Sequence, residues 1–284
     1  MLGNINWQVM GGRVLGPAPF LVAGILNVTP DSFYDGGAHE LPEQAAAHAA
    51  RLLAEGADML DVGGESTRPG ARSVDAAEEI ARVMPAIQAA LALRCADGQA
   101  PAVSVDTYKA EVAARALAAG AVIVNDVSAC RFDQKLADVL AQYKPGYVLM
   151  HSQGRPADMQ KAPVYADVVE DILAFFEERL DYLVCRGLPE ACIVLDPGIG
   201  FGKTLAHNLD ILRRVDKFLS LGRPVYMGLS NKSLWQKLLG LGPLERQVAT
   251  AVATALTWSK GASIHRVHDV ALARQSLRIA EAIG

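Results

Sequence analysis

The feature that most constrains the fold is a pattern that repeats along the chain. A short apolar run ends at a single polar residue, and a loop marked by Gly or Pro and then a helical stretch follow it. The runs close, in order, at Asn27, Asp61, Asp106, Asn125, His151 and Asp196, and runs 224–227 and 263–265 lead into Ser230–Lys232 and Arg266. They are rich in Val and Ile and apolar throughout, as parallel strands covered on both faces are. Roughly eight such strands alternating with helices predict a closed (β/α)8 barrel of the α/β class, with an open doubly wound sheet as the alternative.

Helical periodicity and one Gly-Gly turn complete the expected architecture. Two helices are predicted from apolar faces made of Val169, Ile172, Leu173, Phe176, Leu180 and Leu183, and of Val270, Ala273, Leu277 and Ala280. Trp7–Met10 and Arg13–Leu15 flank Gly11-Gly12, which predicts a short N-terminal hairpin before the barrel. No long linker interrupts the pattern, so we expect residues 1–284 to form one domain.

Charge and cysteine usage narrow the class of protein. A formal net charge of −4, from 27 basic and 31 acidic residues, gives no support to a nucleic-acid partner. No apolar run approaches the roughly 18 residues of a membrane span, and the first residues do not read as a signal peptide. The four cysteines form no CxxC pair, which favours reduced thiols and a cytoplasmic location.

In a (β/α)8 barrel the loops after the strands carry the chemistry. The long loop 27–37 and the loop 61–70 combine glycines with polar side chains, and Arg68 offers donors suited to phosphate oxygens. Arg266 and His268 form a second basic cluster at the last strand end. An isolated loop arginine is usually only solvated, but two basic clusters on barrel loops can converge on one anion.

Asp106, Asn125 and Asp196 each end a predicted strand, so their side chains are expected to meet at the barrel mouth. Three such acceptors suit a flat heterocycle with amino and ring N–H donors, because a carboxylate accepts two parallel hydrogen bonds from such an edge. Binding of Mg²⁺ by the same oxygens is the competing interpretation. Helix capping is a further alternative for Asp106, and a structural hydrogen bond is an alternative to substrate contact for His151.

Taken together, these segments resemble the dihydropteroate synthase family. The similar stretches are 24–37, 56–70, 104–109, 124–126, 149–154, 196–204, 228–233 and 266–270, in family order over nearly the whole chain. The resemblance implies a transferase that joins p-aminobenzoate to 6-hydroxymethyl-7,8-dihydropterin diphosphate with Mg²⁺, releasing diphosphate. It also implies a homodimer, for which apolar helices near 244–256 and 271–283 are candidate interfaces.

The resemblance also implies roles for individual residues. Pterin contacts fall to Asp106, Asn125, Asp196, Lys232, Gly228 and Met150. Diphosphate contacts fall to Asn27, Thr67, Arg68, Arg266 and His268, with Asn27 also holding the metal. The p-aminobenzoate contacts fall to Phe33, Thr67, Pro69, Phe201, Lys232 and Ser233. The residues expected to act in catalysis are Asp106, Lys232, Asp35 and Arg68.

Two positions depart from the family pattern. Asn231 stands where the family usually has Arg, and Ser152 stands where Met is more usual. One alternative function is a non-catalytic pterin-binding paralogue, which only Asn231 favours. Another is a pterin-dependent methyltransferase, which has no need for a diphosphate grip, so the basic clusters 67–68 and 266–268 count against it.

Overall fold

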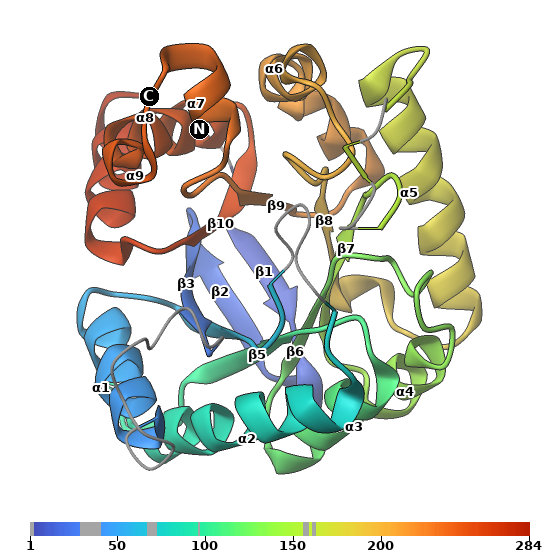
Figure 1. Cartoon of the computed structure of the whole chain (residues 1–284), viewed down its shortest axis with the longest axis vertical. Coiled ribbons are helices and arrows are strands. Elements are labelled where there is room, and N and C mark those ends of the chain that lie inside the picture. Colours follow the sequence, from blue (N-terminus) through green and yellow to red (C-terminus); the bar gives the residue numbers. More distant parts are fainter. Residues whose placement is uncertain (1–2, 29–40, 67–72, 96, 156–158, 161–162) are drawn as a thin grey trace.

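The predicted barrel is present in the computed structural model, which describes residues 3–28, 41–66, 73–95, 97–155, 159–160 and 163–284. Within these residues eight parallel strands close on themselves in the order β10-β3-β4-β5-β6-β7-β8-β9, and helices surround them (Figure 1). The strands are β3 (Leu21–Asn27), β4 (Met59–Gly63), β5 (Ala102–Asp106), β6 (Ile123–Asp126), β7 (Gly146–Met150), β8 (Ile193–Asp196), β9 (Val225–Gly228) and β10 (Ala262–Val267).

The helices follow the strands in sequence and cover the outside of the barrel (Figure 1). They are α1 (Leu41–Ala54), α2 (Ala76–Ala92), α3 (Ala110–Ala119), α4 (Leu136–Tyr143), α5 (Val168–Cys185), α6 (Leu205–Arg213), α7 (Leu234–Leu239), α8 (Gln247–Trp258) and α9 (Val270–Ile283). None of those described is long and apolar enough to cross a membrane.

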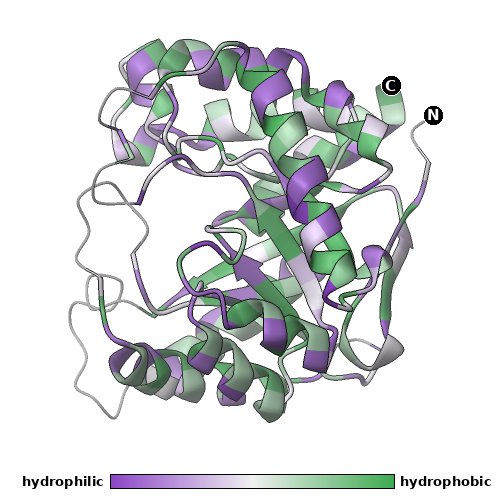
Figure 2. Ribbon diagram, turned by 90° about the vertical axis from the view of Figure 1, so that its right-hand side faces the viewer, coloured by the Kyte–Doolittle hydropathy of each residue, from purple (hydrophilic) through white to green (hydrophobic). Residues whose placement is uncertain are grey.

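Local sequence explains where several helices begin and which face they bury. Asp75, Asp167 and Asp269 stand at the N-caps of α2, α5 and α9, and each side chain accepts a backbone N–H of the first turn. The predicted inner faces of α5 and α9 are buried, with Leu173 only half-buried at the margin of its face. Figure 2 shows the helices banded with alternating apolar and polar residues, as expected of helices with one buried face.

The predicted hairpin closes one end of the barrel. It consists of β1 (Ile5–Gln8) and β2 (Val14–Ala18), paired antiparallel, and it crosses the centre of the helical ring in Figure 1. Trp7 is fully buried in the barrel interior, and its Nε1 donates to the Cys192 carbonyl at 2.7 Å. A side chain at position 146 would lie 2.7 Å from Val9, so only glycine fits beneath the hairpin.

One predicted strand boundary was wrong in a way that matters for function. The second barrel strand was expected to end at Asp61, but β4 continues to Gly63 and Asp61 is completely buried within it. A charged residue in an apolar run usually marks the end of a strand, because an unpaired buried charge is costly. Asp61 is an exception because its carboxylate has charged and polar partners inside the barrel.

Candidate active site

Strand register brings the predicted acceptors together at the carboxyl ends of the barrel strands. Asp106 lies beside Asn125, and Met150 lies beside Asp196 on the next pair of strands. Arg266 lies beside Gly228 on the opposite side of the mouth. At Gly228 a Cβ would meet nothing within 4 Å, so the backbone there faces open space.

A hydrogen-bonded cluster links four strands, β4, β5, β6 and β10, across the barrel. Arg266 donates through Nε to Asp61 Oδ2 at 2.5 Å and through Nη2 to Asp106 Oδ2 at 2.7 Å. Asn125 Nδ2 donates to the same Asp61 oxygen at 2.9 Å. Burial raises the pKa of Asp106 to about 7, with the Arg266 guanidinium acting in the opposite direction. The cluster is therefore a strong electrostatic centre with little water around it.

Asp196 is the second buried carboxylate of the mouth. Its Oδ1 accepts the backbone N–H of Gly198 at 2.7 Å, and its side chain is almost inaccessible. Burial raises the pKa of Asp196 to about 6, although the Gly198 hydrogen bond and the Lys232 ammonium favour the charged form. Because little water reaches this carboxylate, a ligand that donates N–H groups would supply the hydrogen bonds that water would otherwise make.

Lys232 interacts electrostatically with this carboxylate and lies against the Phe201 ring. Its Nζ lies 4.3 Å from the centre of the Phe201 ring, within range of a cation–π contact. Burial lowers the pKa of Lys232 to about 8, and the charge of Asp196 opposes that effect. Val127, Met150, Met159 and Phe201 pack together as a separate apolar cluster, so the predicted contacts Met150 and Phe201 share one wall.

Lys203 is a polar residue of this region that the sequence did not reveal. Its side chain is completely buried, and Nζ contacts His151 Nδ1 at 3.0 Å and the carbonyls of Phe201 and His151 at 3.0 and 3.3 Å. Burial lowers the pKa of His151 to about 2, so the ring is neutral and Nδ1 accepts from Lys203. His151 therefore has the structural hydrogen bond that was one of its two predicted roles.

The other predicted residues lie around the same mouth with more exposure. Asn27 ends β3, and its Oδ1 lies 3.3 Å from the point where a residue at position 63 would place Cβ. His268 Nδ1 lies 2.8 Å from Ser230 Oγ, and Ser233 is exposed before α7. Phe33, Asp35, Thr67, Arg68 and Pro69 lie outside the described residues.

The backbone conformation at Asn231 is one that asparagine adopts readily. Its φ is 55°, in the left-handed region where Asn is several-fold enriched among non-glycine residues. Its side chain is exposed, and its carbonyl accepts from Nη1 of the buried Arg246 at 3.0 Å. Asn therefore suits the backbone at this position, although the structure gives no reason for the departure from the Arg that the resemblance leads one to expect.

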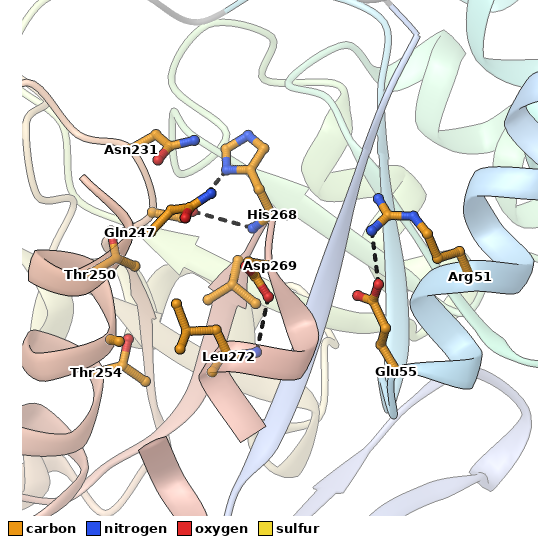
Figure 3. Close-up of a pocket in the computed structure, with 13 residues that line it drawn as sticks. Arg51, Glu55, Asn231, Gln247, Thr250, Thr254, His268, Asp269 and Leu272 are labelled. Carbon is orange, nitrogen blue, oxygen red and sulfur yellow. Dashed lines mark hydrogen bonds and ion pairs between the residues drawn. The ribbon is translucent and has the colours of Figure 1, made fainter. Parts of the chain in front are cut away.

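Beside the mouth, a cavity of about 280 Å³ lies between α1, α8 and the start of α9 (Figure 3). Arg51 and Glu55 form an ion pair on its α1 side, and Asn231 and His268 lie at its other margin. Its lining contains neither Asp106 nor Asp196, so the cavity is a neighbour of the carboxylate cluster rather than part of it.

A further buried ion cluster supports the loop after β4. Lys109 donates to carboxylate oxygens of both Glu65 and Glu79, and the Tyr108 hydroxyl donates to Glu65 at 3.1 Å. Burial raises the pKa of Glu79, with the Lys109 hydrogen bond opposing it. One cation therefore holds two carboxylates that would otherwise repel one another.

Comparison with known proteins identifies this arrangement. Residues 23–268 match the family model described as pterin binding enzyme. A dihydropteroate synthase of Bacillus subtilis is 43% identical over 250 residues, covering 88% of this chain and 84% of that protein. The Xanthomonas albilineans dihydropteroate synthase solved with 4-aminobenzoic acid aligns with a TM-score of 0.88 at 41% identity, over 98% of both chains.

A second Xanthomonas albilineans dihydropteroate synthase structure, in complex with 7,8-dihydropteroate, aligns with a TM-score of 0.85 at 38% identity, over 98% of both chains. The family match spans the strands that carry Asp61, Asp106, Asn125, Asp196 and Arg266. The chain therefore belongs to the pterin-binding enzyme family, and its function is that of a dihydropteroate synthase, a transferase of folate biosynthesis.

Proposed function

We propose that the mouth divides the dihydropteroate synthase reaction between a heterocycle subsite and an anion subsite. In the heterocycle subsite, Asp106, Asn125 and Asp196 accept hydrogen bonds from the pterin edges, while Lys232 donates. The open backbone at Gly228 and the thioether of Met150 complete the subsite. Two desolvated carboxylates beside one amide suit a ring rich in N–H donors, because each donor makes a hydrogen bond that water cannot make in this site.

In the anion subsite, Arg266 and His268 bind the diphosphate together with Asn27, and Thr67 and Arg68 join them from outside the described residues. Arg266 supports this role because its guanidinium is partly exposed while its Nε and Nη2 are anchored. Because the guanidinium is anchored, its remaining N–H donors keep a fixed direction. This lowers the entropic cost of binding an anion.

The proposed chemistry begins with cleavage of the bond between the pterin methylene carbon and the diphosphate oxygen. The electron pair leaves with the diphosphate, and the positive charge on carbon spreads into the electron-rich dihydropterin. Asp106 stabilises that charge, because a carboxylate in a dry site interacts strongly with a developing cation. Arg266 stabilises the leaving anion in the same step, with Arg68 and Asp35 assigned from the resemblance alone.

The arylamine nitrogen of p-aminobenzoate then attacks the methylene carbon and afterwards loses its proton. A neutral arylamine is nucleophilic without a strong base, so this step needs no side chain to activate the nucleophile. Phe201, Lys232 and Ser233 form the described part of the p-aminobenzoate subsite, and Phe33, Thr67 and Pro69 are proposed to complete it. The ammonium of Lys232 attracts the carboxylate of this substrate.

The proposed cofactor is Mg²⁺, with Asn27 as its protein ligand. Asn27 Oδ1 and Asp106 Oδ2 lie 3.3 and 3.6 Å from one point above Gly63, so two oxygens face a common space. Mg²⁺ commonly keeps several waters and takes one or two protein oxygens plus substrate phosphates, which this donor set suits. When bound, the ion would neutralise charge on the diphosphate.

The observation that carries the proposal is the meeting of Asp106, Asn125 and Asp196 with Arg266 at one mouth. Incubating the protein with the dihydropterin diphosphate, p-aminobenzoate and Mg²⁺ should yield 7,8-dihydropteroate and diphosphate in equal amounts. Asp106→Asn should bind pterin yet turn over far more slowly. Pterin binding without product in the wild type would favour the non-catalytic alternative.

We also propose a cytoplasmic homodimer. Leu244, Val248, Val252 and Leu256 recur every four residues and are 53–90% exposed, and Ile279 and Ile283 of the neighbouring α9 are also exposed. A stripe of this kind on a protein surface marks an interaction site. Val252→Asp should convert a sedimenting dimer into monomers, whereas Val164→Asp, at a more exposed site elsewhere, should leave the dimer intact. All four cysteines are unpaired, which supports a reducing compartment.

A further inference from the structure

We infer that Asp61 is a positioning residue of the active site, which sets the hydrogen-bonding direction of Asn125 and the aim of Arg266. This inference deepens the proposed roles of those two residues and rests on them. Asp61 lies inside β4, beneath the mouth, and its side chain is closed off from solvent.

Strand register places Asp61 below the residues that meet the ligand. It pairs with Ser104, whereas Asn125 pairs with Asp106, two residues nearer the mouth on the same strand β5. Asp61 is 0% exposed, while the Arg266 side chain is 20% exposed and that of Asp106 is 12% exposed. Asp61 therefore acts through its neighbours.

The carboxylate of Asp61 fixes which side of the Asn125 amide faces upward. A carboxylate only accepts hydrogen bonds, so Asn125 must turn its NH2 group toward Asp61, as the 2.9 Å contact shows. The amide oxygen lies on the other side of the planar group. Asn125 therefore presents an acceptor to the ligand, which favours a heterocycle that carries an N–H donor at this point.

The same carboxylate oxygen orients the guanidinium of Arg266. Its Nε donates to Asp61 at 2.5 Å, and its Nη2 donates to Asp106 at 2.7 Å, so two bonds define the plane of the group. No partner for Nη1 is found within the described part of the chain. Without Asp61, the guanidinium could rotate about its bond to Asp106, and its free donors would no longer point toward the anion.

The cost of burying Asp61 supports a functional role. Only one of its oxygens is paired: Oδ1 is buried without a hydrogen bond to any described residue. The cluster beneath is mostly apolar, with Ile123, Val148 and Val194, and it also holds the buried Tyr226. An apolar residue at position 61 would avoid this cost, so the carboxylate is retained for what it holds in place.

Asp61→Asn and the control Ser104→Ala separate positioning from packing. Ser104 is the register neighbour of Asp61, its hydroxyl is also buried without a described partner, and it contributes nothing to the cluster. In Asp61→Asn the new amide can donate to Asn125, so the Asn125 amide is free to turn over. We expect about 10- to 100-fold weaker binding of 6-hydroxymethylpterin, and weaker binding of inorganic diphosphate with Mg²⁺, in calorimetry.

Two further readouts exclude a purely structural effect. In an Asn125→Ala background, Asp61→Asn should add little to the loss of pterin affinity while still weakening diphosphate. The KM for p-aminobenzoate should stay within about twofold of the wild type. Unchanged affinity for both ligands, or a rise in that KM as large as the other losses, would overturn the inference. Because wild-type turnover is measured separately, failure of the inference leaves the synthase assignment intact.

Discussion

Asp196 is a residue at which ligand binding and fold stability should oppose each other. Burial raises its pKa from 3.8 to about 6, so the folded protein holds a proton there more tightly than the unfolded chain does. Near neutral pH the carboxyl is ionised in both states. The difference of roughly 2 pH units, at about 1.36 kcal/mol each, makes the charged form cost about 3 kcal/mol of stability.

Asp196→Asn removes that cost and keeps an oxygen that can accept from Gly198. We expect the free energy of unfolding near neutral pH to rise by about 1–3 kcal/mol, the lower figure allowing for an NH2 group that needs its own acceptor. The same change should weaken binding of 6-hydroxymethylpterin by more than about tenfold, because a charged acceptor is replaced by a neutral amide.

The pH dependence gives this prediction its sharpest test. Between pH 3.8 and about 6 the folded state binds more protons at Asp196, so this group lowers wild-type stability as pH rises through that interval. The advantage of Asp196→Asn should therefore be full above about pH 6 and vanish near pH 4. Urea unfolding of both proteins, followed by circular dichroism at several pH values, measures this difference.

Asp167 provides a control of opposite sign. The Arg214 side chain lowers its pKa, and its carboxylate caps α5, so Asp167→Asn should reduce stability near neutral pH. If Asp196→Asn proved less stable than the wild type, or gained equally at both ends of the pH range, the reasoning from burial would be refuted.

Three other changes test different parts of the structure. Lys109→Met leaves its two carboxylate partners facing each other, so unfolding free energy should fall by about 3–5 kcal/mol near neutral pH, and the loss should shrink as the pH falls through the raised pKa of Glu79 and that carboxyl takes up a proton. Arg266→Ala should weaken calorimetric binding of the dihydropterin diphosphate far more than that of the bare pterin; equal losses would contradict the anion subsite. Gly146→Ala should cost about 1–3 kcal/mol in thermal unfolding, because its Cβ would meet Val9, and an unchanged transition would argue against the tight hairpin contact.

The sequence was sufficient for the barrel and for the acceptors of the mouth, since both depend on strand ends. Asp106, Asn125 and Asp196 follow apolar runs directly, and parallel strands bring such positions together whatever the exact register. The two helices read from apolar periodicity and the N-terminal hairpin were predicted for similar local reasons.

Asp61 and Lys203 could not be assigned from sequence, because their roles depend on partners far along the chain. Arg266 lies 205 positions from Asp61, and His151 lies 52 positions from Lys203. From sequence alone, an isolated lysine is predicted to be exposed to solvent, and an aspartate in an apolar run is predicted to end a strand. Only the closed barrel shows that both are buried and paired.

The bond between Trp7 and Cys192 has a consequence for the order of folding. The indole donates across 185 positions to Cys192, just before β8, a segment that emerges from the ribosome much later than the hairpin does. Until Cys192 is synthesised, the Trp7 indole therefore lacks this acceptor, and its apolar surroundings are incomplete without Val194, Tyr226 and Ile264 of the later strands. Contacts of such long sequence separation form late, because loop-closure entropy opposes them. The fluorescence of Trp7, with the other tryptophans replaced by Phe, should consequently report the final closure of the barrel floor.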